Sequence, residues 1–243
     1  MRDLRSADHL PNLRANRDAR DPMWLPEQRR GTTPQMIGRY PDYDVLESID
    51  SWDDATRRVI EARLDTTRSL TFFSISEQAA ARRLCDVVMA QDREPRLPVM
   101  ELIDEKMAKG QLDGFHFEDM PDDRVTWHVV LAGLDETSRD RCGVTFSRCD
   151  ERSAQSIVED FSRGELRLRT DESLNIARAW SVCTRAILAA FYSHPWAWNE
   201  IGFGGPAYPH GYMRLGPLST LDPHESPGAT SEDPVRATED REA

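Results

Sequence analysis

Residues 172–212 read ESLNIARAWSVCTRAILAAFYSHPWAWNEIGFGGPAYPHGY, an apolar helical pattern followed by a stretch rich in aromatic residues, glycine and proline. Apolar side chains recur at helical spacing over residues 172–193, which predicts the longest helix of the protein. Over residues 194–212, glycine and proline favour a fixed, irregular backbone rather than another helix. This second stretch is the most informative candidate for a functional element.

The sequence before this stretch is also helical in pattern. Ser74 lies three residues before Glu77, which is the spacing of a capping box at a helix start. Helices are predicted over residues 53–64, from this capping box to about residue 90, and over residues 99–108, 122–140 and 153–161. Alternation typical of a strand is limited to residues 165–169. The sequence therefore predicts an all-α fold, with a compact multi-helix domain over residues 51–220.

The two ends of the chain differ from this domain in composition. Residues 1–50 are rich in Arg, Asp and Pro, which predicts an extended N-terminal arm. Its apolar islands, which contain Trp24 and Tyr40, are expected to dock onto a surface. Residues 221–243 are acidic and lack apolar anchors, which predicts a disordered C-terminal tail.

Composition and charge exclude several classes of function. The net charge of −12, with no basic stripe, argues against a nucleic-acid partner. No apolar run approaches the roughly 18 residues that cross a bilayer, and no signal sequence is recognisable. Cys142 and Cys149 could pair across a short loop, but nothing points to secretion, so reduced thiols are the expectation. These features predict a cytoplasmic protein with no membrane span.

Motifs of a self-sufficient enzyme are absent from the sequence. There is no dinucleotide-binding fingerprint, P-loop, zinc-protease motif or nucleophile elbow. His116 lies near Glu118 and Asp119, but no second histidine stands at ligand spacing, so a solvated loop is favoured over a metal site. His128 is expected to pack on a helix face, and His194 to cap the end of the apolar helix. No catalytic, cofactor-binding or metal-binding residue is predicted.

The aromatic stretch is instead a candidate docking surface. It holds too many aromatic side chains for one surface loop, so some are expected in the core and others as interface anchors. For any one of them the two roles remain open. The predicted partner-interface residues are His194, Pro195, Trp196, Trp198, Glu200, Gly202, Phe203, Gly204, Gly205, Pro206, Tyr208 and Tyr212, together with Trp24 and Tyr40 of the arm.

Three short segments resemble a known family. They are the helix start from Phe73 to Glu77, residues 191–195 (FYSHP) and residues 201–206 (IGFGGP). With them, the chain resembles the gluconate 2-dehydrogenase subunit 3 family over about residues 70–215. The last segment is a fairly specific motif, whereas the helical remainder carries little weight.

The resemblance implies a non-catalytic small subunit that binds and stabilises a flavoprotein large subunit of the glucose–methanol–choline type. That partner would carry FAD and the catalytic histidine and would oxidise a sugar, glycoside or polyol, while this chain alone would bind no cofactor. A heterodimer or a higher-order hetero-oligomer would result. Many such small subunits bear a twin-arginine signal, which is not recognisable here, so a cytoplasmic complex is expected.

Two other functions stay open at the level of sequence. The chain could be a stand-alone helical enzyme that uses His194, Glu200 or His128 as acid–base groups. It could also be a small-molecule binding module that uses the His194–Tyr212 stretch as a platform. Activity of the isolated chain would separate these functions from the subunit role.

Overall fold

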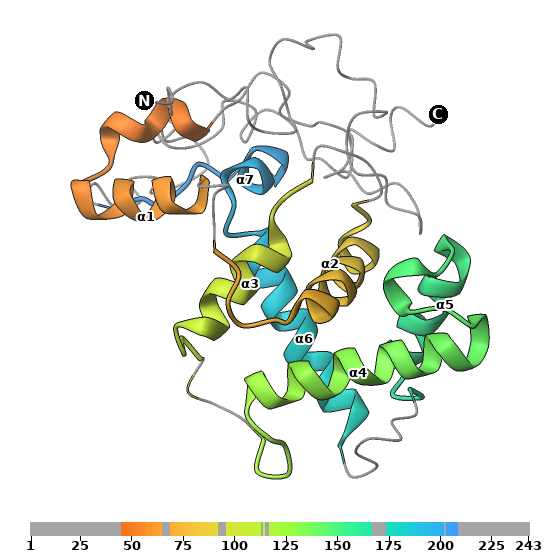
Figure 1. Ribbon diagram of the computed structural model, residues 1–243. Helices are drawn as coiled ribbons and strands as arrows, with labels where there is room; N and C mark the ends of the chain where they lie inside the picture. Colours follow the sequence, from red (N-terminus) through yellow and green to blue (C-terminus); the bar gives the residue numbers. More distant parts are fainter. Residues whose placement is uncertain are drawn as a thin grey trace, which may run out of the picture. The chain divides into compact units, whose positions relative to one another are not determined.

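The computed structural model describes residues 45–64, 69–91, 96–112, 114, 117–166, 174–201 and 203–208, and of Glu47 and residues 199–201 only the backbone. Within these ranges every regular element is a helix, which confirms the predicted all-α class (Figure 1). Residues 1–44 of the predicted arm and the predicted tail lie outside the described residues. The chain divides into two units, one containing η4, α1 and α7 and the other containing α2 to α6 with η5.

The second unit is a bundle of α-helices. Its elements are α2 (Ile75–Met89), α3 (Val99–Ala108), α4 (Asp123–Cys142), the 3-10 helix η5 (Phe146–Arg148), α5 (Glu151–Ser162) and α6 (Ile176–Phe191). Helices α2 and α6 form the centre of the bundle, because each of them packs against the four other α-helices (Figure 1).

The core of this bundle is aromatic as well as aliphatic. Trp127 of α4 is fully buried and lies edge-on to Phe73, with 5.7 Å between the ring centroids. Phe161 of α5 makes a similar contact with Trp180 of α6 at 5.1 Å. Burying rings of this size removes a large apolar area from water, and edge-to-face pairs add specificity to the packing.

Local sequence signals account for the helix boundaries. The predicted capping box is present, since the Ser74 side chain accepts from the backbone of Glu77 and the Glu77 carboxylate accepts from the backbone of Ser74. Asp122 caps α4 by accepting from two backbone N–H groups of the first turn. Gly143, with φ at 72°, ends α4 in the left-handed conformation that glycine adopts without strain.

The longest described helix is α4, with 20 residues, and not the predicted apolar helix, which as α6 has 16. Helix α4 agrees with the prediction of residues 122–140 to within two residues at either end, so the difference in length comes from α6. Helix α6 begins later than predicted because Asn175 caps it, with its side-chain oxygen accepting from the N–H of Arg178 at 3.2 Å.

The other unit contains η4 (Val45–Ser51), α1 (Asp54–Leu64) and α7 (Pro195–Ile201). Helix α7 packs against both η4 and α1, so residues far apart in sequence meet here. The predicted arm includes residues 45–50, which in the structure are helical because Val45, Leu46 and Ile49 are buried in this unit.

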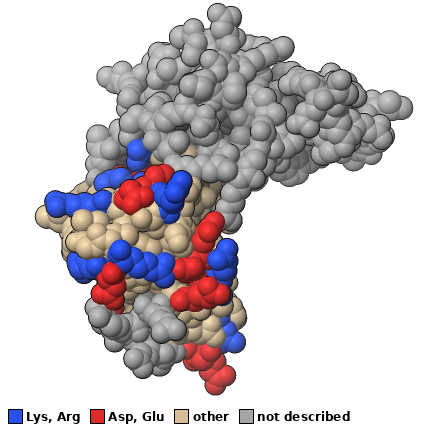
Figure 2. All heavy atoms as spheres, turned by 90° about the vertical axis from the view of Figure 1, so that its right-hand side faces the viewer, with Lys and Arg blue, Asp and Glu red and all other residues tan. Residues whose placement is uncertain are grey.

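The surface carries charges of both signs. On the face shown in Figure 2, Lys and Arg side chains lie beside Asp and Glu side chains, and neither sign gathers alone. Ion pairs between helices contribute to this pattern, among them Arg83 with Glu151 and Arg141 with Asp160. None of the described helices combines the length and the apolar character needed to cross a bilayer.

Candidate functional site

The candidate docking stretch begins with a helix, which corrects the prediction of an irregular backbone after residue 194. Pro195 is the first residue of α7, where its fixed φ suits a helix and its missing N–H costs nothing. His194 lies before it and caps this helix. Its Nδ1 accepts from the N–H of Trp196 at 3.2 Å, and its carbonyl accepts from the N–H of Ala197 at 3.0 Å.

His194 was expected to close the preceding apolar helix, but α6 already ends at Phe191. The imidazole is buried, and its Nδ1 is engaged in the cap of α7. Because Nδ1 accepts, the neutral ring carries its proton on Nε2. The residue therefore starts a helix rather than ending one, and its role in the described structure is to shape the backbone.

The two tryptophans of α7 lie in the core of their unit. Trp196 and Trp198 are both buried. The indole N–H of Trp198 donates to the carbonyl of Tyr192 at 2.6 Å. The guanidinium of Arg63 lies 5.7 Å from the centre of the Trp198 ring and donates to the carbonyl of Ser193 at 3.2 Å. These contacts tie α7 to α1 and hold the segment that precedes α7.

Glycine after α7 has a strict steric role. Gly205 has φ at +83°, and a Cβ at this position would lie 2.8 Å from Cζ2 of Trp52 and 3.0 Å from Cγ2 of Val45. Glycine suits this position for two reasons, because the backbone has a positive φ and lies too close to other side chains for a Cβ. The segment after α7 is packed tightly against η4 and the residue that follows it.

Aromatic side chains of the same region remain at the surface. Tyr192, Phe203 and Tyr208 are 43%, 37% and 64% exposed. The Phe203 ring lies edge-on to Trp198 at 5.5 Å, so a buried tryptophan supports an exposed phenylalanine. We call Tyr192, Phe203 and Tyr208 the aromatic surface.

The predicted interface residues thus divide between core and surface. His194, Trp196, Trp198, Gly204 and Gly205 are buried, Pro206 is half-buried, and Phe203 and Tyr208 are exposed. The Glu200 side chain, Gly202, Tyr212, Trp24 and Tyr40 lie outside the described residues. Tyr192 is missing from the prediction because it directly follows a buried phenylalanine in the apolar pattern, and only the packing shows that it faces outward.

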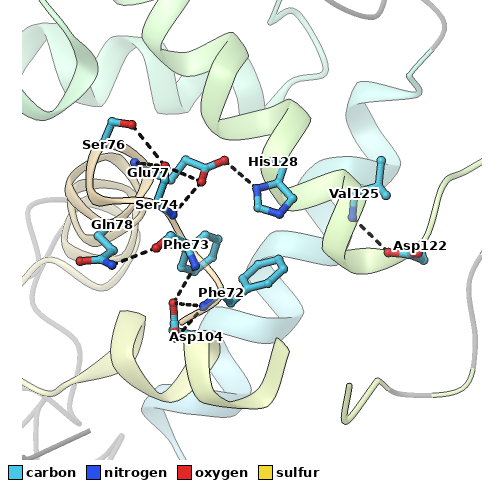
Figure 3. A network of polar contacts seen from close by, with 10 residues as sticks. All are labelled: Phe72, Phe73, Ser74, Ser76, Glu77, Gln78, Asp104, Asp122, Val125 and His128. Atoms are coloured by element: carbon cyan, nitrogen blue, oxygen red, sulfur yellow. Dashed lines mark hydrogen bonds and ion pairs between the residues drawn. The ribbon is translucent and has the colours of Figure 1, made fainter. Parts of the chain in front are cut away.

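A second cluster of functional side chains lies in the helical bundle, at the start of α2 (Figure 3). Nδ1 of His128 is 2.6 Å from Oε1 of Glu77. The other carboxylate oxygen of Glu77 accepts from the backbone N–H of Ser74 at 2.9 Å and from its hydroxyl at 2.7 Å. The imidazole also stacks on Phe72, with 4.6 Å between ring centroids.

The carboxylate of Glu77 is held in its ionised form. Partial burial opposes ionisation, but hydrogen bonds from Ser74 and His128 outweigh it, so the pKa of Glu77 is lowered from its usual value of 4.5. A carboxylate on one imidazole nitrogen orients the ring and leaves the other nitrogen able to exchange a proton. The pair is the arrangement in the described residues that best suits acid–base chemistry.

Asp104 of α3 positions the aromatic residues below this pair. Its carboxylate is completely buried and accepts from the backbone N–H groups of Thr71, Phe72 and Phe73 at distances of 2.8 to 3.3 Å (Figure 3). Sequence reasoning missed this residue. Its helical position could have indicated burial, because Asp104 lies four residues after Met100 and therefore on the same buried face of α3.

A shallow hollow of about 320 Å³ opens beside the Glu77–His128 pair. Ser74, Ser76 and Glu77 of the α2 start line one side, and Asp135, Glu136 and Arg139 of α4 line the other. Arg139 pairs with Asp135 at 3.0 Å. Among the described residues no group of three His, Cys, Asp or Glu side chains is arranged to hold a metal ion. His116 lies outside the described residues, and Asp119 pairs with Arg178.

The Glu77 interactions predict a small acid-dependent loss of stability. Since the pKa of Glu77 is lower in the folded chain, its contribution is present above pH 4.5 and is lost as the pH falls through the folded value. Partial exposure limits the effect to less than about 1 kcal/mol. Glu77→Gln should therefore flatten the decline of the unfolding free energy below pH 4.5, measured by urea unfolding. A Glu77→Gln profile parallel to that of the wild type would contradict this assignment.

Comparison with known proteins identifies the family but no individual relative. No curated protein and no solved structure matches the chain. The family model described as gluconate 2-dehydrogenase subunit 3 matches residues 75–205, more than half of the 243 residues. The matched range runs from the first residue of α2 to Gly205 and includes Glu77, His128 and α7. The chain therefore belongs to the gluconate 2-dehydrogenase subunit 3 family, whose members are subunits of dehydrogenase complexes.

Proposed function

We propose that this chain is a non-catalytic small subunit that binds and stabilises an FAD-dependent large subunit of the glucose–methanol–choline type. The partner holds the FAD and oxidises a sugar, glycoside or polyol in the cytoplasm. The family match over residues 75–205 carries this proposal, because members of the family are subunits of dehydrogenase complexes. The matched range includes α7 and the glycine-rich segment up to Gly205. The chain's own contribution is a rigid surface rather than a reacting group.

The aromatic surface is the docking face in this proposal. Tyr192, Phe203 and Tyr208 keep substantial exposed area although they flank a well-packed core. Phe203 rests on Trp198, which is held by hydrogen bonding and by Arg63, so little conformational entropy is lost when a partner covers it. Rigid aromatic side chains of this kind are typical anchors of protein interfaces.

Stabilisation of the large subunit follows from mass action. A protein that binds the folded large subunit and not its unfolded form raises the apparent free energy of unfolding of that subunit. The effect grows with the concentration of the small subunit relative to its dissociation constant. Loss of the docking face therefore lowers both the affinity and the yield of folded, FAD-loaded partner.

The docking face is tested by a double substitution, Phe203→Ala with Tyr208→Ala. Removing two aromatic anchors is expected to weaken binding of the large subunit by about 10- to 100-fold. Affinity is measured with the purified subunits by calorimetry. The matched control is Ile75→Ala, which removes an equally apolar side chain that is 87% exposed at the start of α2. The control should bind like the wild type.

The possible results distinguish an error in the proposed function from an error in the proposed docking face. A large subunit that is soluble, FAD-loaded and fully active when expressed without this chain overturns the proposed function. A complex that forms normally with the double variant overturns only the docking face. If Ile75→Ala weakens binding as strongly as the double variant, the contact lies on the bundle instead.

A second candidate function rests on the Glu77–His128 pair. An imidazole oriented by a carboxylate is the geometry of a general acid–base group, and the carboxylate of this pair, Glu77, lines the hollow. If this function is correct, the isolated chain should catalyse a reaction by itself. His128→Ala should abolish that activity, and Glu77→Gln should strongly reduce it. Substrate oxidation that appears only with the large subunit, and that survives both substitutions, excludes it.

A further inference from the structure

Two cysteines lie together at the corner between α4 and α5. Cys142 is the last residue of α4, and Cys149 follows η5. Sγ of Cys149 is 2.8 Å from the hydroxyl oxygen of Ser138. Ser138 and Cys142 are four residues apart on α4, so they share one face of that helix and are neighbours along it. The side chain of Cys149 therefore rests on the face of α4 that carries Cys142.

The loop between the two cysteines is held by several contacts with α4. The Ser138 hydroxyl donates to the carbonyl of Val144 at 2.8 Å, and the N–H of Phe146 donates to Oδ1 of Asp135 at 2.9 Å. Phe146 is fully buried. Both cysteine side chains therefore lie next to Ser138, and the loop that joins them is held against α4.

The two thiols differ in their access to solvent. Cys142 is partly exposed, whereas Cys149 is buried behind it. Burial raises the pKa of the Cys149 thiol, and the neighbouring Cys142 thiol raises it further, although the hydrogen bond with Ser138 acts in the opposite direction. Cys142 is thus the sulfur that a solvent-borne oxidant reaches first, and Cys149 is the second thiol within its reach.

The other two cysteines provide an internal comparison. Cys85 and Cys183 lie on α2 and α6, and both are buried in the bundle. Burial raises the pKa of each thiol well above its usual value. Deeply buried thiols of this kind react slowly with oxidants.

We propose that Cys142 and Cys149 form a redox-active dithiol, which hydrogen peroxide converts into an intramolecular disulfide. The Cys142 sulfur attacks one peroxide oxygen, the O–O bond breaks, and a sulfenic acid and water result. The Cys149 sulfur then attacks the Cys142 sulfur, the S–O bond breaks, and a second water leaves. The two thiols lose two electrons, which reduce the hydrogen peroxide, and both thiol protons end in water.

The disulfide would join the end of α4 to the start of α5 covalently. In the reduced state this corner is held by non-covalent contacts, among them hydrogen bonds of Ser138 and Asp135, the burial of Phe146 and the ion pair between Arg141 and Asp160. Oxidation therefore rigidifies a corner that is independent of the aromatic surface. The dithiol neither requires the proposed function nor is required by it.

The test uses the full-length chain and hydrogen peroxide as the oxidant. After brief treatment with equimolar peroxide, remaining thiols are alkylated in denaturant and the chain is digested with trypsin. Cleavage after Arg141, Arg148 and Arg152 places the two cysteines on separate peptides, residues 142–148 and 149–152. The expected result is one cross-linked species, lighter by about 2 Da than the two reduced peptides together. Cys85 and Cys183 are expected to be recovered in alkylated form.

Two variants assign the order of the steps. In Cys149→Ser the second thiol is missing, so a sulfenic acid should persist on Cys142 and be trapped by dimedone. In Cys142→Ser, Cys149 should remain fully alkylable after the same treatment. The proposal is overturned if wild-type Cys142 becomes over-oxidised without a cross-link, if the cross-link joins two chains, or if Cys85 and Cys183 are oxidised as fast. Because the wild-type digest decides each of these outcomes, a variant that fails to fold leaves the test intact.

Discussion

Gly205→Ala is expected to lower the free energy of unfolding of the unit that contains α7 by about 3 kcal/mol. A methyl group at this residue would lie 2.8 Å from Cζ2 of Trp52, a buried side chain that would have to shift to admit it. It would also force alanine into a backbone conformation, with φ at +83°, that L side chains rarely adopt. Both costs arise in the folded state alone, since the unfolded chain meets neither constraint.

Gly143→Ala is the matched control for this effect. Gly143 also has a positive φ, at 72°, but a Cβ there would meet no atom within 4 Å. It therefore carries only the backbone strain, about 1 kcal/mol. Urea unfolding of both variants, followed by tryptophan fluorescence, separates the steric cost from the backbone cost. Equal losses for the two variants would show that Trp52 and Val45 yield to the methyl group.

Gly205→Ala also bears on the proposed function. Displacing the segment after α7 should move Phe203 and Tyr208, which belong to the same segment, while leaving the helical bundle folded. Binding of the large subunit should fall together with the stability of this unit.

Asp104→Ala is expected to destabilise the helical bundle by about 3 kcal/mol. The substitution removes the acceptor of three backbone N–H groups, at Thr71, Phe72 and Phe73, and the last of these bonds is fully buried. No water replaces a carboxylate easily at such a site, so the donors lose their partner without compensation. Thermal unfolding by circular dichroism measures the loss.

Two further variants define the origin of that loss. Asp104→Asn keeps one side-chain oxygen that can accept, so its cost should lie between the wild type and Asp104→Ala. Asp122→Ala removes an exposed helix cap that also accepts from two N–H groups, and it should cost only about 1 kcal/mol. Amide hydrogen exchange at residues 71–73 should accelerate in Asp104→Ala. A loss no larger than that of Asp122→Ala would mean that the segment finds other acceptors.

Much of the bundle could be predicted from sequence because its signals are local. The Ser74–Glu77 capping box acts within a few residues, and α2 begins directly after Ser74. The helices predicted over residues 99–108 and 122–140 correspond closely to α3 and α4. The resemblance to the family was likewise visible in short segments, and the family model matches residues 75–205. Signals of this kind do not depend on what the helix packs against.

The candidate sites were less predictable because they depend on contacts between distant residues. The His128 ring is oriented by Glu77, which is 51 residues away, and the segment that carries Phe72 is held by Asp104, which is 32 residues away. The role of Pro195 was also not predictable, because a proline can end one helix or begin the next. In the structure it begins α7, and His194 accepts the hydrogen bond of a backbone N–H in the first turn.

By itself, the sequence determined the helical class, the capped start of α2 and the family, because periodicity, caps and short motifs are properties of neighbouring residues. Only the tertiary structure decided which aromatic residues of the stretch after α6 are core and which form a surface. Burial depends on the elements that pack against a residue, and Trp52, Val45 and Arg63 lie more than a hundred residues away in sequence. They cover Trp198 and Gly205, and they leave Phe203 and Tyr208 exposed.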